Sequence, residues 1–172
     1  QLVAWFGALA VRPGQRAATV LCSRAAPVHA AGLAPSVGSA CGGELDPWPR
    51  TVVGRGDVEA PVADELGPYL YESDAAVLAA GLGPALAVEH GLAVVDPAGG
   101  YLSGRVQLDD PALTGWAVDD VLPLDVKRLK SHLRARGIGR LEIKKRGVEL
   151  EPEPLRRQLA GPGADRATLL VA

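Results

Sequence analysis

Large nonpolar side chains are scarce in this chain of 172 residues. It has no methionine and a single phenylalanine, and aromatic residues make up 4% of the composition. Hydrophobic residues still reach 48%, most of them small. Because small side chains each remove little nonpolar area from water, we expect closely packed backbones rather than a few large anchors. The 21 glycines and 14 prolines predict many turns, yet well-patterned segments remain and exclude disorder throughout.

Signals for membranes, secretion and metals are also missing. There is no run of 18 apolar residues, so no transmembrane helix is predicted, and the opening "QLVAWFGALAV" lacks the basic region of a signal peptide. Cys22 and Cys41 are expected to be free thiols of a cytoplasmic protein, with a disulfide as the alternative. His29, His90 and His132 do not have zinc-ligand spacing, so we assign no metal.

No catalytic motif stands out in the sequence. It contains neither a Walker A loop nor a Gly-x-Ser-x-Gly elbow. In the run after residue 50, Gly54 and Gly56 lack the third glycine of a dinucleotide-binding loop, and Pro61 interrupts the helix that should follow. We therefore predict no catalytic residue and no bound cofactor in this chain. The pairs Asp109–Asp110 and Asp119–Asp120 are expected to be surface acids, since adjacent strand residues point to opposite faces.

What the chain does have is an uneven distribution of charge. Residues 1–120 hold 6 Lys and Arg against 14 Asp and Glu, whereas residues 121–172 hold 12 against 6. The overall charge of −2 hides this split. A basic segment attracts a polyanion, and an acidic one repels it or contacts a basic partner.

The last third has the clearest pattern of elements. A strand is predicted at 115–123, a helix from the N-cap Asp125 to the stop at Gly137, a strand at 139–147, a helix at 153–161 and a strand at 167–172. Strands joined by helices favour parallel pairing. The predicted fold class is therefore α/β of the α+β kind, ending in a β-α-β-α-β unit.

The earlier part is predicted to be a smaller mixed segment that opens with a β-hairpin. The runs "LVAWFGALAV" and "AATVLC" form the hairpin, and residues 23–48 form a long loop. Two short helices are expected at 74–81 and 84–90, ending at Gly91. The domain boundaries predicted are 1–48 for the hairpin and loop, 49–114 for the mixed linker segment, and 115–172 for the basic unit.

The cations of the basic unit are predicted to share one outward surface that contacts nucleic acid. On the helix they form two rows at helical spacing, on either side of the apolar stripe of Val126, Leu129 and Leu133. Lys and Arg on such a surface contact phosphates. Residues 121–172 contain no Phe, Tyr or Trp, which favours backbone or shape recognition over stacking. The candidate nucleic-acid-binding residues, which the resemblance below assigns to RNA, are Lys127, Arg128, Lys130, Arg134, Arg136, Arg140, Lys144, Lys145, Arg146, Arg156 and Arg157.

These residues carry a resemblance to a known family. The phrase "RLEIKKRG" and the pattern Tyr69-x-Tyr71-Glu72-x-Asp74 resemble the C-terminal part of bacterial class I methyltransferases that use S-adenosylmethionine and carry a THUMP-like domain. Ser73 stands where proline is expected. The resemblance is specific over residues 66–172, and the opening hairpin is similar to the closing strands of such a catalytic sheet.

The resemblance implies an accessory region that binds RNA and positions it for a methyltransferase. Residue 1 is not methionine and lies within an apolar run, so we expect a piece of a longer protein. Its implied partners are RNA, such as a transfer or ribosomal RNA, and the N-terminal methyltransferase domain of the parent protein. S-adenosylmethionine would be the cofactor of that parent. The alternative is a docking or dimerisation module with no role in nucleic-acid binding.

Overall fold

The computed structural model describes residues 14–20, 50–95 and 100–172. These residues divide into two compact units, the first containing residues up to 117 and the second residues 118–172. Each unit has its own hydrophobic core. The mixture of helices with several sheets confirms the α+β fold class. Among the described residues, no helix is long and apolar enough to cross a membrane.

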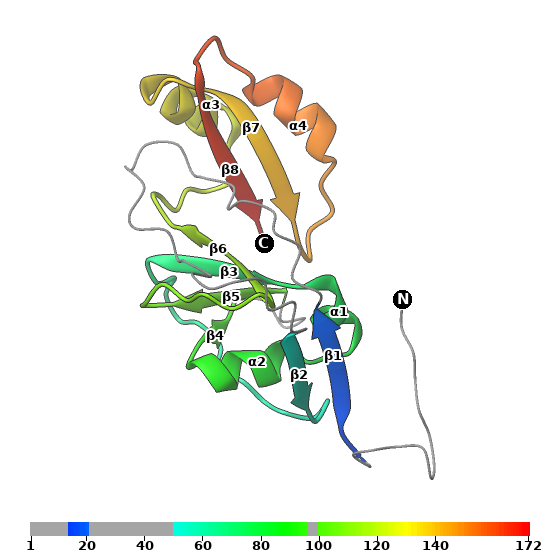
Figure 1. The fold of residues 1–172 in the computed structure, drawn as a ribbon. Helices are drawn as coiled ribbons and strands as arrows, with labels where there is room; N and C mark the ends of the chain where they lie inside the picture. The colour runs from blue at the N-terminus through cyan, green and yellow to red at the C-terminus, as the bar shows by residue number, and fades with distance from the viewer. Residues whose placement is uncertain (1–13, 21–49, 96–99) are drawn as a thin grey trace, which may run out of the picture. The chain divides into compact units, whose positions relative to one another are not determined.

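The first unit is built from antiparallel strands (Figure 1). A four-stranded sheet has the order β4-β5-β3-β6, and β1 and β2 form a separate pair. An N-terminal antiparallel pair is therefore present, although the first strand of the predicted hairpin lies outside the described residues. The strands are β1 Arg16–Val20, β2 Arg50–Gly54, β3 Tyr69–Ser73, β4 Ala93–Val94, β5 Tyr101–Gly104 and β6 Leu113–Ala117.

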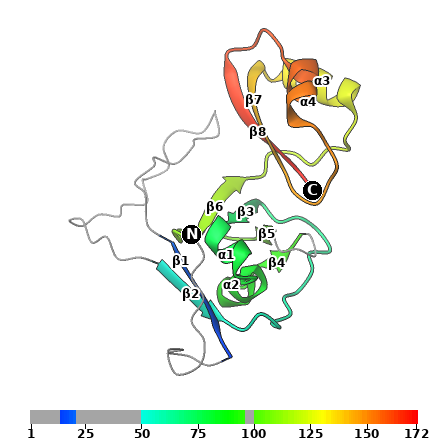
Figure 2. The same cartoon turned by 90° about the vertical axis from the view of Figure 1, so that its right-hand side faces the viewer.

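Two short helices, α1 (Ala75–Ala79) and α2 (Gly83–His90), follow β3 (Figure 2). Asp74 begins α1, because its carboxylate accepts a hydrogen bond from the Ala76 backbone N–H at 2.8 Å. Gly91 ends α2 in the left-handed conformation, with φ 64°. The predicted pair of helices broken near residue 82 is confirmed.

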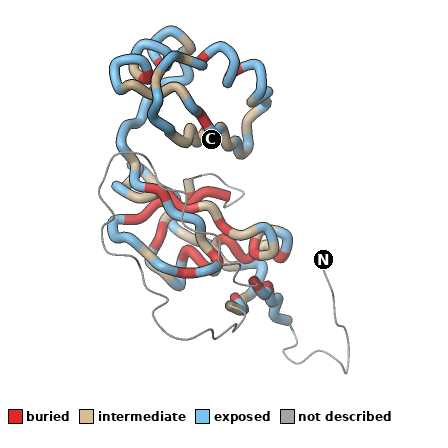
Figure 3. The backbone as a smooth tube through the Cα atoms, turned by 45° about the horizontal axis from the view of Figure 1, so that its top comes forward, coloured by how far each residue is buried: buried red, intermediate tan, exposed pale blue. Residues whose placement is uncertain are grey.

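The core of the first unit combines small aliphatic side chains with two large anchors. Buried Ala, Val and Leu residues fill its two clusters, as expected from the composition, and Figure 3 shows buried positions in both strands and helices. Tyr71 and Tyr101 nevertheless are the largest fully buried side chains, which the composition did not predict. The ring of Tyr71 fits between Gly104 and Gly115, where an added Cβ would lie 3.3 and 2.8 Å from it. Its hydroxyl donates to the Val106 carbonyl at 2.6 Å.

The second unit places two helices on one face of a two-stranded parallel sheet. Its elements are α3 Val126–Ala135, β7 Ile138–Lys145, α4 Pro152–Leu159 and β8 Asp165–Val171. Leu129 and Leu133 of α3 pack with Leu155 and Leu159 of α4 over Leu141 of β7. The predicted β-α-β-α-β order is confirmed, as is parallel pairing for β7 and β8. The strand before α3 behaves differently, since β6 pairs antiparallel with β3.

Two backbone segments nearly touch where β7 and β8 begin. An added Cβ on Gly139 would lie 2.0 Å from the carbonyl oxygen of Gly163, and one on Gly163 would lie 1.9 Å from the carbonyl oxygen of Gly137. The register of the two strands shifts between Ile138 and Arg140. Positions 139 and 163 therefore require glycine, because a side chain would collide with the neighbouring backbone. Gly137 has a different role, since it ends α3 with φ 69°.

Candidate nucleic-acid interface

One row of cations lies on the exposed side of α3. Asp125 begins this helix by accepting a hydrogen bond from the Arg128 backbone N–H at 2.8 Å. Burial of the leucine stripe against the sheet leaves Lys127, Lys130 and Arg134 exposed on one flank. With Ser131 they line a shallow depression in the surface. None of the three cations forms an ion pair with a described residue, so their charge is not locally neutralised.

Two members of the second row of α3 lie beside carboxylates of the segment that precedes the helix. His132 Nε2 lies 3.2 Å from the Asp120 carboxylate, and Arg136 contacts Asp120 and Asp119, the latter at 4.0 Å. Arg128, the remaining member, is exposed and has no described ion-pair partner. Asp119 and Asp120 are exposed, consistent with the prediction of surface acids, and they pair with His132 and Arg136.

Two cations of β7, Arg140 and Lys144, point away from the helices. Leu141 and Ile143 face the core, so the alternation of side chains puts Arg140, Glu142 and Lys144 on the opposite face of the sheet. Lys144 Nζ lies 4.0 Å from a Glu142 carboxylate oxygen. The prediction that all cations share one surface is therefore wrong, because the unit carries cations on both faces of its sheet.

The remaining predicted residues, at the end of β7 and on α4, differ in exposure and in whether a carboxylate pairs with them. Lys145 is exposed at the end of β7, beside a shallow depression that also contains Glu149 and Glu151. The Arg146 backbone N–H donates to the Val171 carbonyl at 2.9 Å, and its side chain is half-buried. On α4, Arg156 pairs with Glu153 at 2.5 Å, while Arg157 is exposed and has no described ion-pair partner.

Arg166 is a cation of the same unit that the sequence reasoning missed. It lies directly opposite Arg140 in the parallel register of β7 and β8. Its neighbour Ala167 packs on the core, so Arg166 faces the opposite way, on the side of Arg140. Alternation of Ala167, Leu169 and Val171 could have predicted an outward Arg166. Its position beside Arg140 depends on the register, which the sequence alone does not determine.

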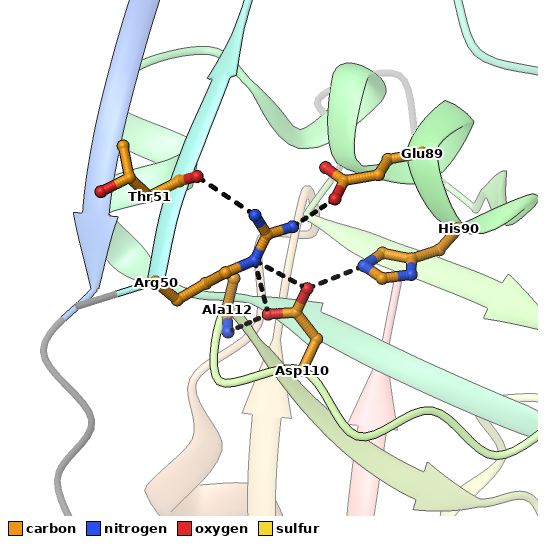
Figure 4. A network of polar contacts seen from close by, with 6 residues as sticks. All are labelled: Arg50, Thr51, Glu89, His90, Asp110 and Ala112. Atoms are coloured by element: carbon orange, nitrogen blue, oxygen red, sulfur yellow. Dashed lines mark hydrogen bonds and ion pairs between the residues drawn. The ribbon is translucent and has the colours of Figure 1, made fainter. Parts of the chain in front are cut away.

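A second polar cluster lies in the first unit, around Asp110 (Figure 4). Arg50 on β2 donates from Nε to both oxygens of Asp110, at 3.0 and 3.3 Å, and from Nη2 to Glu89 at 2.5 Å. His90 Nε2 lies 2.8 Å from Asp110 Oδ2, and the Ala112 backbone N–H donates at 2.7 Å. Asp110 is only 8% exposed, so its prediction as a surface acid is wrong.

The cluster around Asp110 ties β2, α2 and the segment before β6 together. Burial alone raises the pKa of Asp110, but hydrogen bonds from Ala112, His90 and Arg50 outweigh burial and hold the pKa below its usual range. One ligand atom each from Glu89, His90 and Asp110 lies within 4.8 Å of the others, as a metal site requires. The guanidinium of Arg50 already supplies the positive charge there. We therefore assign the cluster a structural role.

The C-terminal part of the chain is similar to known proteins. Residues 113–172, from β6 to β8, match the model of the THUMP domain-like family. The chain is 42% identical over 94 residues to uncharacterized S-adenosylmethionine-dependent methyltransferases of two Mycobacterium tuberculosis strains, CDC 1551 and H37Rv. That match covers 54% of this chain and 25% of each relative. The chain thus spans about a quarter of the length of the curated relatives it matches.

A solved structure shares the fold of the chain. It is the crystal structure of a candidate methyltransferase from Porphyromonas gingivalis W83, with a TM-score of 0.58 and 20% sequence identity. The match covers 72% of this chain and 31% of that one. Together with the curated relatives, it confirms the predicted resemblance to the THUMP-like region of a methyltransferase that uses S-adenosylmethionine.

Proposed function

We propose that this chain is the RNA-binding, substrate-positioning region of a methyltransferase that acts on RNA in the cytoplasm. In this proposal another domain of the parent protein binds S-adenosylmethionine and carries out the transfer. The THUMP-like match over residues 113–172 and the similarity to part of methyltransferases support the assignment to such a parent. The role of the chain itself is to hold the RNA, and we assign it no catalytic residue.

The observation that carries the proposal is the first cation row of α3. Lys127, Lys130 and Arg134 share one exposed flank and have no carboxylate partner among the described residues. In the second row of the same helix, by contrast, His132 and Arg136 lie beside Asp119 and Asp120, and Arg128 alone has no described ion-pair partner. A cluster of like charges left without counter-charges favours an external polyanion, because binding releases counterions condensed on its phosphates.

The mode of binding follows from the residues available. Lys and Arg contacts to phosphate position a nucleic acid without distinguishing bases. Residues 121–172 provide no Phe, Tyr or Trp on which a base could stack. We therefore propose recognition of the RNA backbone and its shape, with the choice of methylated base made elsewhere in the parent protein.

The proposal is tested by filter binding of an in-vitro transcribed transfer RNA to the full chain at several salt concentrations. We expect binding that weakens steeply with salt. Lys127→Gln/Lys130→Gln/Arg134→Gln should lower the affinity at least tenfold and reduce the slope of log K against log salt by about 0.9 for each phosphate that is no longer neutralised. Arg55→Gln/Arg105→Gln, which alters exposed arginines of the first unit, is the control and should bind as the unaltered chain does.

Docking without nucleic acid is the alternative that the charge split favours. The acidic first part of one copy could then attract the basic unit of another copy or of the parent protein. Light scattering separates the two functions. Salt-sensitive dimers together with no retention of RNA at low salt would replace our proposal by docking.

A further inference from the structure

Arg140 and Arg166 form a cross-strand pair on the face of the sheet that the helices leave uncovered. They are directly opposite in the register of β7 and β8, and both side chains are exposed. Neighbouring strands lie about 4.8 Å apart, so the two side chains leave the backbone close together. Neither forms an ion pair with a described residue.

Positive charge is concentrated near the beginning of β7 and β8, on the face of the sheet that carries Arg140 and Arg166. The next outward pair along the strands is Glu142 opposite Thr168, followed by Lys144 opposite Leu170. Glu142 is 4.0 Å from Lys144 and is not within ion-pair distance of Arg140. The carboxylate on this face is therefore directed to the lysine, and the two arginines are left as neighbouring like charges.

Like charges placed directly opposite one another on a sheet repel. A phosphate group of the RNA backbone, which carries one negative charge, would lie between two cations and attract both of them. Guanidinium groups can form bidentate hydrogen bonds to phosphate oxygens. We infer that Arg140 and Arg166 together bind one phosphate group of the bound RNA. This site lies on the face of the sheet opposite α3. This inference rests on the proposed function and adds a second contact surface, including a residue that was absent from the predicted set.

The prediction is tested by a double-mutant cycle on the full chain with the same transfer RNA. We expect Arg140→Gln and Arg166→Gln each to weaken binding, and the double variant to weaken it about tenfold, the range of one charge-assisted contact. Because both arginines hold the same phosphate, the effects of the single variants should not add. Arg140→Lys/Arg166→Lys keeps the charge but loses the forked geometry and should recover only part of the affinity.

A second measurement does not depend on RNA. Titration with inorganic phosphate, followed by NMR of the arginine Nε–H groups, should shift the signals of Arg140 and Arg166 together, and Arg166→Gln should abolish the response of Arg140. The thermal midpoint of each variant should be no lower than that of the unaltered chain, since removing one of two opposed like charges relieves repulsion in the sheet.

The outcomes separate this inference from the proposed function. If the double variant binds RNA as the unaltered chain does while the α3 variant loses binding, the arginine pair is excluded and the proposed function remains. Additive effects of Arg140→Gln and Arg166→Gln would show two independent contacts and overturn the shared phosphate. If the unaltered chain retains no RNA, both proposals fail.

Discussion

At the scale of single residues, the cluster around Asp110 shows how a carboxylate can be buried in a chain with few large side chains. Hydrogen-bonding groups of Arg50, His90 and the Ala112 backbone surround it. The prediction of Asp110 as a surface acid failed because its side-chain partners come from residues 20 and 60 positions away. No local pattern indicates such a contact, whereas a cap such as Asp74 is defined by its immediate neighbours.

Loss of this carboxylate should destabilise the first unit. Asp110→Ala leaves Arg50 and His90 without their buried partner, and we expect the free energy of unfolding to fall by about 3 kcal/mol, at the lower end of the range for a broken buried ion pair because Arg50 is partly exposed. Urea denaturation followed by circular dichroism measures this loss. Asp64→Ala, at an exposed position of the same unit, should change stability by less than about 0.5 kcal/mol.

The contribution of Asp110 should also depend on pH. Because the pKa in the folded state lies below the unfolded value of about 3.8, the stabilisation is fully present above that value and is lost as the pH falls through the folded pKa. The stability difference between the unaltered chain and Asp110→Asn should accordingly be present at neutral pH and shrink below about pH 4. A difference that persists unchanged in strong acid, below the folded pKa, would contradict this account.

The crossing of Gly139 and Gly163 leads to another prediction at the same scale. Gly163→Ala would place a methyl group 1.9 Å from the Gly137 carbonyl oxygen, so the strands must separate. We expect a loss of about 2 kcal/mol or more in the free energy of unfolding, at the upper part of the range for overpacking. Gly161→Ala is a matched control, since its added Cβ finds no atom nearer than 3.6 Å. Equal stability of the two variants would show that the backbones can yield here.

At the scale of elements, the start and stop signals of the helices were predictable. Asp74 and Asp125 cap α1 and α3, and Gly91 and Gly137 end α2 and α3 in the left-handed conformation. These signals depend on residues within one turn of each helix end. Strand pairing was less predictable, because it depends on contacts between distant segments. β6 has the sequence of a strand but joins β3 instead of the strands that follow it.

The N-cap of α3 leads to a prediction about the stability of the second unit. Asp125→Ala removes the acceptor for the Arg128 backbone N–H, and we expect the second unit to lose about 1 kcal/mol of stability. Asp125→Ser should retain most of the cap. Thermal unfolding of the three proteins, monitored by circular dichroism, would compare them directly. An alanine variant as stable as the serine variant would show that the cap contributes nothing.

At the scale of the whole molecule, composition predicted the charge of the basic unit but not its layout. The excess of cations after residue 120 is visible in the sequence, and the rows on α3 follow from helical spacing. Their division between two faces depends on which side of the sheet the helices cover, and the pairing of one row with carboxylates depends on Asp119 and Asp120. The division between faces and the pairing with these carboxylates both depend on tertiary contacts. The THUMP-like match begins at residue 113, so it includes β6, whose sheet belongs to the first unit.

The sheet of the second unit has a further consequence. Among the described residues, β7 and β8 pair only with each other, so each strand has an outer edge with backbone donors and acceptors that no described strand uses. Such unpaired edges can form backbone hydrogen bonds with the edge strands of other copies, which leads to aggregation. Mutual repulsion among the basic side chains along β7 and at the start of β8 opposes that stacking. The charges that we propose to bind RNA would thereby also protect the protein from self-aggregation, most strongly at low ionic strength.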